Sequence, residues 1–88
     1  MRLEFSEKSI DDLKSFSLDE KEFIFEKIKY LVKNYEILKN SKKITALKGK
    51  HKGKYRFVIA RKIRVIFQIK DNNLIILVLR VGRRKDIY

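Results

Sequence analysis

Hydrophobic residues in this chain follow a helical spacing through about the first 40 positions and a strand-like alternation afterwards. Residues 2–5 alternate between polar and apolar side chains and predict a short strand. Ser6 is suited to cap a short helix whose apolar row is formed by Ile10 and Leu13. From residue 18 to about residue 40, apolar side chains recur every third or fourth position, which predicts a long amphipathic helix.

The long helix carries two further signals. Ser17 and Glu20 precede its apolar run and match a capping box, in which each side chain accepts a hydrogen bond from the other's backbone amide. A second apolar row of Phe23, Tyr30 and Ile37 lies roughly 100° around the helix from the main row. This row either widens the core stripe or forms an apolar strip that a partner protein covers.

The second half of the chain predicts strands separated by turns. Residues 39–54 contain seven lysines and two glycines, and we expect a mobile basic connector with a brief extended segment at residues 44–47. Alternating apolar positions then predict strands over residues 55–59 and 63–70. Asp and Asn at residues 71–73 tolerate positive φ and predict a hairpin turn.

The order of the predicted elements defines a fold class. An apolar run over residues 74–81, ended by Gly82, predicts a central strand. The sequence thus predicts a single α+β domain of residues 1–88 in the order β-α-α-β-β-β. Two N-terminal helices are expected to pack on one face of a mostly antiparallel, twisted sheet. The other face would display Arg56 and Arg64.

Composition excludes several classes of function. The chain has no cysteine, which rules out disulfide scaffolds, thiolate zinc sites and cysteine nucleophiles. One histidine and two carboxylates in the second half make a metal site improbable, and no cofactor is expected. Without a long apolar stretch or a leader-like segment, we expect a cytoplasmic protein with no membrane partner.

Positive charge is concentrated in the second half. Residues 1–41 carry a net charge of −1, whereas residues 42–88 carry +13, with fifteen lysines and arginines against Asp71 and Asp86. Such a field attracts polyanions and drives binding by counterion release. The sequence therefore predicts a nucleic-acid surface carried on a less charged scaffold.

The residues able to carry chemistry are few. Gly49 and Gly53 lack the context of a phosphate-binding loop, and His51 lies in a lysine-rich connector where a solvated histidine is the simpler explanation. What remains is a group of arginines (Arg56, Arg64, Arg80, Arg83 and Arg84) together with Tyr88. Arginine stabilises developing negative charge. It cannot act as a base, because its guanidinium group stays protonated in proteins.

Tyr88 has three possible roles. Neighbouring cations would lower the pKa of its phenol and make it an acid or base for cleavage of RNA by the 2′-hydroxyl. Its ring could instead stack on an unpaired base. It could also plug the sheet as a hydrophobic residue. The residues by themselves leave these roles open.

Short motifs occur in a fixed order in the second half: Leu47-Lys48-Gly49, then Gly53-Lys54-Tyr55-Arg56, then Ile63-Arg64 at the start of an apolar strand, Asp71 in the turn, and Val81-Gly82-Arg83-Arg84-Lys85-Asp86-Ile87-Tyr88 at the end. In this order and spacing the chain resembles the RelE/ParE toxin superfamily, and most closely its RelE-type mRNA interferases. The first half agrees with that family in its helical hairpin and its length.

The resemblance implies a toxin of a type II toxin–antitoxin pair that cuts mRNA in the ribosomal A site and so inhibits translation. Arg64 and Arg84 would hold the scissile phosphate, Arg56 would add charge, and Tyr88 would be the acid/base or stacking residue. The remaining cations are assigned to RNA and ribosome binding: Lys48, Lys50, Lys52, Lys54, Arg61, Lys62, Arg80, Arg83 and Lys85.

The resemblance also implies a RelB-like antitoxin, acidic or amphipathic and containing helices, in a hetero-oligomer with the toxin. The antitoxin would cover an apolar and basic set of residues: Phe23, Tyr30, Ile37, Arg64 and Arg84. The chain departs from the RelE pattern at Val58, where a basic residue is common, and also at Ile63 and Arg83. Two alternatives stay open: a ParE-like toxin that inhibits DNA gyrase, and a catalytically weak relative that only binds nucleic acid.

Overall fold

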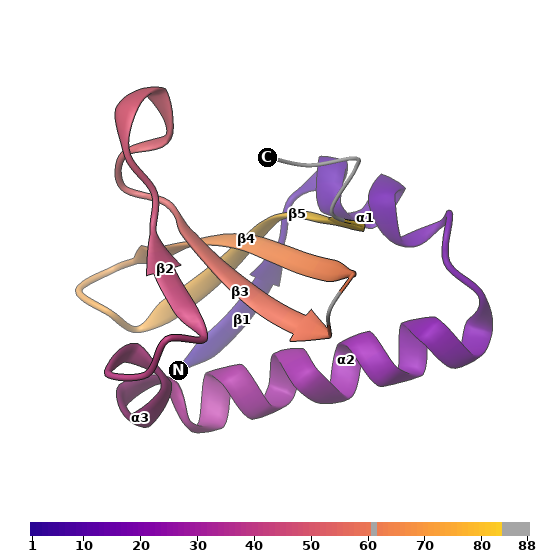
Figure 1. Cartoon of the computed structure of the whole chain (residues 1–88), viewed down its shortest axis with the longest axis horizontal. Coiled ribbons are helices and arrows are strands. Elements are labelled where there is room, and N and C mark those ends of the chain that lie inside the picture. The colour runs from indigo at the N-terminus through magenta and orange to yellow at the C-terminus, as the bar shows by residue number, and fades with distance from the viewer. Residues whose placement is uncertain (61, 84–88) are drawn as a thin grey trace.

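The computed structural model describes residues 1–60 and 62–83, which form three α-helices and a five-stranded sheet (Figure 1). The helices are α1 (Glu7–Leu13), α2 (Leu18–Lys33) and α3 (Tyr35–Lys39). The strands are β1 (Arg2–Phe5), β2 (Ile44–Ala46), β3 (Tyr55–Ala60), β4 (Ile63–Lys70) and β5 (Ile75–Arg83), and a short 3-10 turn, η1 (Gly49–His51), precedes β3.

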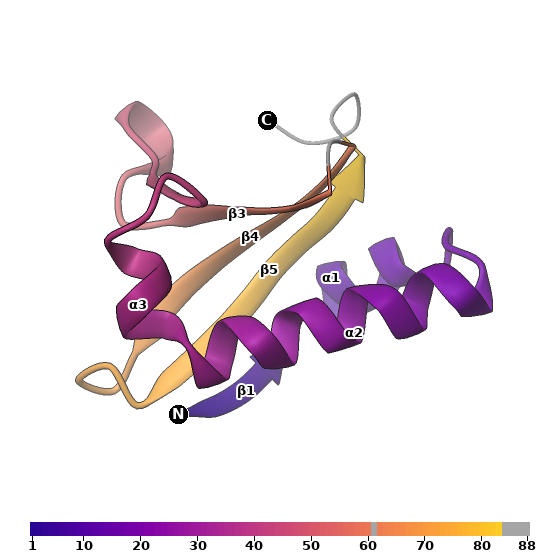
Figure 2. The ribbon, with the colours of Figure 1, turned by 60° about the horizontal axis from the view of Figure 1, so that its bottom comes forward.

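Within the described residues the strands lie in the order β1-β5-β4-β3-β2. The pair β1–β5 is parallel, and the other neighbouring pairs are antiparallel. Figure 2 shows α2 running across one face of this sheet, while α1 lies beside the far end of β5. The predicted α+β class, with helices on one face of a mostly antiparallel sheet, is confirmed.

The core lies between α2 and the sheet face that it covers. Ile24, Ile28 and Leu31 are fully buried on α2 and face a row of buried sheet side chains that includes Val65 and Phe67. Burying such a side chain contributes about 1.5–3 kcal/mol relative to leaving it in water. The main apolar row predicted from the helical spacing is therefore the row that holds the helix on the sheet.

Both predicted helix starts have their caps. The Ser6 hydroxyl accepts a hydrogen bond from the Ser9 amide at 3.1 Å at the start of α1. At the start of α2, the Ser17 hydroxyl accepts from the Glu20 amide and the Glu20 carboxylate accepts from the Ser17 amide. The capping box is thus confirmed.

The single long helix expected to about residue 40 is instead two helices. α2 ends at Lys33, and α3 begins at Tyr35 after Asn34, whose φ of −118° and ψ of 24° are not helical. The Asn34 side-chain amide donates to the Tyr30 carbonyl at 3.0 Å, the same carbonyl that accepts from the Asn34 backbone amide at 2.9 Å. Asparagine competes in this way with helix continuation, which explains the break.

Three details of the second half also differ from the expectations or refine them. The basic connector contains the edge strand β2 and the turn η1. The turn at residues 71–73 has three consecutive positive φ values, 51°, 54° and 71°, as the Asp-Asn-Asn sequence predicts. Gly82 does not end the last strand, because β5 continues through it to Arg83.

Candidate nucleic-acid interface

Arg56 and Arg64 lie on the sheet face opposite to α2, as predicted. Directly opposed residues in an antiparallel ladder share a face, so the register fixes their surroundings. Arg56 on β3 stands opposite Ile66, and Arg64 on β4 stands between Val58 and Gly82. The two arginines are diagonal neighbours, for which Cα separations of about 7–8 Å are typical.

The guanidinium groups of these two arginines are only partly satisfied. Arg56 Nε and Arg64 Nη1 are buried and have no hydrogen-bond partner in the part of the chain that the structure describes. Leaving a buried donor unpaired costs about 1–3 kcal/mol, and more when the donor is charged. An anion with several acceptor oxygens, such as a phosphate, would satisfy both groups at once.

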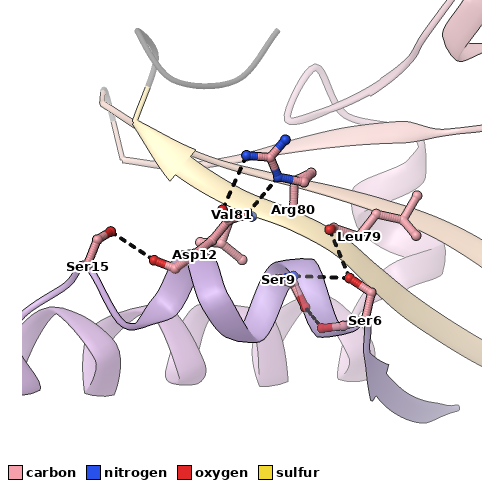
Figure 3. Close-up of polar contacts among 7 residues, drawn as sticks. All are labelled: Ser6, Ser9, Asp12, Ser15, Leu79, Arg80 and Val81. Carbon is pink, nitrogen blue, oxygen red and sulfur yellow. Dashed lines mark hydrogen bonds and ion pairs between the residues drawn. The ribbon is translucent and has the colours of Figure 1, made fainter.

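Arg80 shares this face but is held by a carboxylate. It stands opposite Ile66 in register, so Ile66 lies between Arg56 and Arg80 across the three inner strands. Its Nε donates to Asp12 Oδ2 at 2.8 Å and its Nη2 donates to Oδ1 at 3.2 Å (Figure 3). This bidentate pair ties the arginine to α1, so any contact that Arg80 makes with RNA competes with Asp12.

Arg83 at the end of β5 is engaged on the other side of the sheet. It stands opposite Ile63 in register. Its Nη2 donates to Glu20 Oε2 at 3.0 Å, and its guanidinium carbon lies 4.5 Å from the centroid of the Phe16 ring. The hydrogen bond from the Ser17 amide, helped by the Arg83 charge, holds the pKa of Glu20 below its usual value, so this ion pair is present at neutral pH.

Four lysines of the connector, Lys48, Lys50, Lys52 and Lys54, lie between β2 and β3, where the chain forms a loop that projects from the sheet (Figure 1). Gly49 and Gly53 adopt φ values of +66° and +93°, which shape this loop and which side chains other than glycine rarely accept. Lys48, Lys50 and Lys52 are exposed around them. Burial lowers the pKa of His51, and Lys54 and Lys50 lower it further, so the imidazole is neutral at pH 7.

The described residues cover only part of the predicted site. Lys54 is half-buried and Lys62 is exposed. Four predicted residues lie outside the described part of the chain: Arg61, Arg84, Lys85 and Tyr88. The structure therefore brings Arg56, Arg64 and Arg80 together on one face, and the predicted roles of Arg84 and Tyr88 stay predictions.

The second apolar row is exposed and does not widen the core. Phe23, Tyr30 and Ile37 are 40%, 47% and 72% exposed, and Ile37 belongs to α3 because of the break at Asn34. The row lies on the helices, whereas Arg64 lies on the helix-free face of the sheet. A partner that covers both must reach around the molecule.

Sequence reasoning missed Asp12, whose carboxylate contacts the end of β5. Besides Arg80, the Asp12 carboxylate accepts a hydrogen bond from the Val81 amide at 2.9 Å. A signal was present, because an acidic residue in the last turn of a helix opposes the helix dipole. Such a residue needs a partner elsewhere in the fold.

Two further classes of site were sought in the described residues. No group of three or more His, Cys, Asp or Glu side chains there is arranged to hold a metal ion. No helix in that part of the chain is long and apolar enough to cross a membrane.

Solved structures of toxins from toxin–antitoxin systems share the fold of this chain. The YoeB–YefM complex of Staphylococcus aureus contains a similar chain with 25% identity and a TM-score of 0.71, over 93% of this chain and 94% of that one. The YoeB/ParE toxin of Agrobacterium tumefaciens is similar at 22% identity and a TM-score of 0.73, over 96% and 99% of the two chains. The archaeal RelE–RelB complex of Pyrococcus horikoshii OT3 contains a similar chain with 21% identity and a TM-score of 0.69, over 98% of this chain and 97% of that one.

The family model described as the ParE toxin of the type II toxin–antitoxin system parDE matches residues 3–88. The chain therefore belongs to this toxin family, within the RelE/ParE superfamily. A comparison with curated proteins gives no significant match.

Proposed function

We propose that this toxin is an endoribonuclease that cleaves mRNA by attack of the 2′-hydroxyl on the adjacent phosphate. The observation that carries the proposal is the pair Arg56 and Arg64, whose buried and unpaired N–H groups lie on one open sheet face. Similarity to a YoeB toxin and to an archaeal RelE toxin supports it. On this proposal the 88 residues form a single toxin domain.

The arginines would act on the charge of the phosphate. Attack by the 2′-hydroxyl places extra negative charge on the phosphate oxygens, and preorganised cations stabilise that charge in the transition state. Arg64 is assigned to the scissile phosphate with Arg84, and Arg56 adds charge beside it. Tyr88 is assigned as the acid or base, because no other phenol or imidazole is expected near these arginines.

The basic loop around η1 is assigned to the ribosome. Its exposed lysines project from the sheet and would contact RNA phosphates through charge alone, which positions a protein without reading sequence. We propose on this basis that cleavage occurs in the ribosomal A site and that the toxin acts in the cytoplasm.

The natural partner proposed for this chain is a RelB-like antitoxin with an acidic, helical segment. The solved relatives include complexes of a YoeB with a YefM and of a RelE with a RelB. Charge complementarity favours an acidic segment over Arg64, and an amphipathic helix suits the row of Phe23, Tyr30 and Ile37. Covering both surfaces would block RNA and bury the exposed apolar row.

A second candidate function is inhibition of DNA gyrase without RNA cleavage. The description of the matching family favours it, because that family is named for the ParE toxin. The unpaired guanidinium donors of Arg56 and Arg64 favour the ribonuclease, because a phosphate would satisfy them.

The test is cleavage of translated mRNA, followed by mapping of 5′ ends, beside a gyrase assay with the same protein. Arg64→Ala should lower the cleavage rate by 10²–10³-fold, because one preorganised donor to a developing oxyanion is worth about 2.7–4 kcal/mol. Tyr88→Phe should lower it by about 10²–10⁴ if the hydroxyl transfers a proton. A gyrase effect without cleavage would establish the second candidate.

The matched control is Lys70→Ala. Lys70 is exposed at the end of the same strand as Arg64 and on the same face, but it stands opposite Ile75, away from the arginines. The control should cleave at the wild-type rate. Equal rates for wild type, Arg64→Ala and Lys70→Ala would contradict the assignment of the phosphate site.

A further inference from the structure

The outer edge of β5 loses its strand partner halfway along. β1 pairs with β5 only as far as Phe5 opposite Val78, so the described residues provide no neighbouring strand on that side of β5 beyond Val78. Unpaired backbone groups at this place would weaken the strand. The first residues of the helical hairpin fill the place instead (Figure 3).

Side chains of α1 and of its N-cap residue form hydrogen bonds with backbone groups of β5 that have no strand partner among the described residues. The Ser6 hydroxyl donates to the Leu79 carbonyl at 3.0 Å, and the Val81 amide donates to Asp12 Oδ2 at 2.9 Å. The same carboxylate holds both the backbone of Val81 and the guanidinium of Arg80. Its side chain is only 13% exposed, so these contacts are shielded from water and weakly screened.

A second carboxylate, that of Glu20 on α2, binds Arg83 at the end of β5. Glu20 divides its two oxygens: Oε1 accepts from the Ser17 amide at the start of α2, and Oε2 accepts from Arg83. Phe16 packs under the Arg83 guanidinium. Asp12 and Glu20 together therefore fasten the end of β5 to the end of α1 and the start of α2.

This end of β5 lies next to the arginines of the candidate phosphate site. Gly82 stands directly opposite Arg64, and Arg80 stands opposite Ile66 beside Arg56. Arg84, the predicted second phosphate ligand, follows Arg83 in the sequence. The position of the strand end therefore sets the surroundings of Arg64, which pairs with Gly82, and the position of Arg80.

We infer that Asp12 and Glu20 are positioning residues of the phosphate site, which they set by fixing the end of β5 beside Arg64. The inference rests on the proposed ribonuclease activity. The carboxylates would act through placement, since a displacement of about 1 Å in a catalytic group can cost on the order of 10²-fold in rate. They oppose RNA binding as charges, so removing them should not weaken the affinity for RNA.

The test uses two variants that separate these effects. Glu20→Gln keeps an acceptor for the Ser17 amide, because glutamine serves in a capping box, but it loses the ion pair with Arg83. Asp12→Ala removes both the ion pair with Arg80 and the acceptor for the Val81 amide. Asp11→Ala is the matched control, because Asp11 is the adjacent residue on α1 and its ion pair with Lys14 is exposed.

Three measurements are made on each variant: the single-turnover cleavage rate on translated mRNA, the affinity for a 2′-deoxy-substituted, uncleavable RNA, and amide hydrogen exchange. We expect Asp12→Ala and Glu20→Gln to cleave at least tenfold more slowly while binding the uncleavable RNA as tightly as wild type. All assays are run well below each variant's melting temperature. Asp11→Ala should match wild type throughout.

Several outcomes would overturn the inference. Unchanged cleavage would show that the contacts are not needed for placement, and faster cleavage would show that the carboxylates merely restrain Arg80 and Arg83. A parallel loss of RNA affinity would place the effect in binding. If wild type does not cleave RNA, the proposed function fails, and exchange of the Val81 amide decides whether the strand end is fastened: faster exchange in Asp12→Ala than in Asp11→Ala supports it, and equal exchange overturns it.

Discussion

At the scale of single residues, the phosphate site is notable for an apolar neighbour. Val58 stands directly opposite Arg64 on the helix-free face, at a position where RelE-type toxins commonly carry a basic residue. On the proposed function, the isopropyl side chain of Val58 would give the phosphate an uncharged contact on one side. The developing negative charge would therefore be met by fewer cations than the neighbouring positions could hold.

Replacing Val58 by lysine should raise the cleavage rate about tenfold, since a further cation would face the phosphate oxygens. Like charges directly opposite each other in a sheet are destabilising, so the variant should lose about 0.2–1 kcal/mol of stability. Cleavage kinetics and a urea unfolding curve measure the two effects. Val58→Met is the control for side-chain length, and an equal gain in both variants would argue against charge as the cause.

At the scale of elements, the start of α2 links a helix cap to a strand end through Glu20. The pKa of Glu20 is lowered chiefly by the hydrogen bond from the Ser17 amide, with a contribution from Arg83. A carboxyl group whose pKa is lower in the folded state contributes stability above its unfolded pKa, here near 4.5, and loses that contribution as the pH falls through the folded pKa.

The melting temperature of wild type should therefore exceed that of Glu20→Gln at pH 7, and the difference should shrink as the pH falls below 4.5 and vanish below the folded-state pKa of Glu20. Glu22→Gln is the control, because Glu22 is an exposed carboxylate on the same helix. A difference between wild type and Glu20→Gln that persists in acid would show that the carboxylate charge is not its source.

The elements differ in how far the sequence predicts them. The capping box at Ser17 and the turn at residues 71–73 depend on side chains within four residues of each other, so both could be predicted locally. The break at Asn34 is also local, but its signal, one asparagine in a strong apolar pattern, is weak. The edge strand β2 has only three residues, which is too short for an alternation to be distinguished from chance.

The candidate site also contains residues that could be placed from local sequence patterns and residues that could not. Arg56 and Arg64 could be placed on one face because adjacent strands of a hairpin fix their register. Asp12 could not be assigned to the end of β5, because it meets Arg80 across 68 residues of sequence. Nor could the engagement of Arg83 by Glu20, 63 residues away, be inferred from spacing.

At the scale of the whole molecule, Arg56, Arg64 and Arg80 lie on the helix-free face of the sheet, and Lys48, Lys50 and Lys52 lie on the loop around η1. Binding to a 20-nucleotide oligouridine should weaken as salt rises, with a log–log slope of about −0.7 for each phosphate neutralised. Replacing Lys50 and Lys52 by glutamine should make the slope less negative by about 1.4.

The control for this measurement is the pair Lys29→Gln and Lys33→Gln, which removes the same charge from exposed positions of α2. That variant should keep the wild-type slope. Equal changes in the two double variants would mean that RNA senses only the net charge of +12, without preference for the loop.

Of the five described strands, β1 and β5 are farthest apart in the sequence and yet pair with each other. β1 has β5 as its neighbour in the sheet, and the Ser6 hydroxyl that caps α1 also bonds to Leu79, 73 residues later. While the chain is still being translated, β1 and α1 therefore lack β5, the strand against which they pack. Pairings between residues so far apart in the sequence form slowly. The sheet closes only once β5 has left the ribosome. On the proposed function, a nascent chain would therefore not yet cleave the message that encodes it, and the proposed antitoxin could bind the chain before its arginine face is complete.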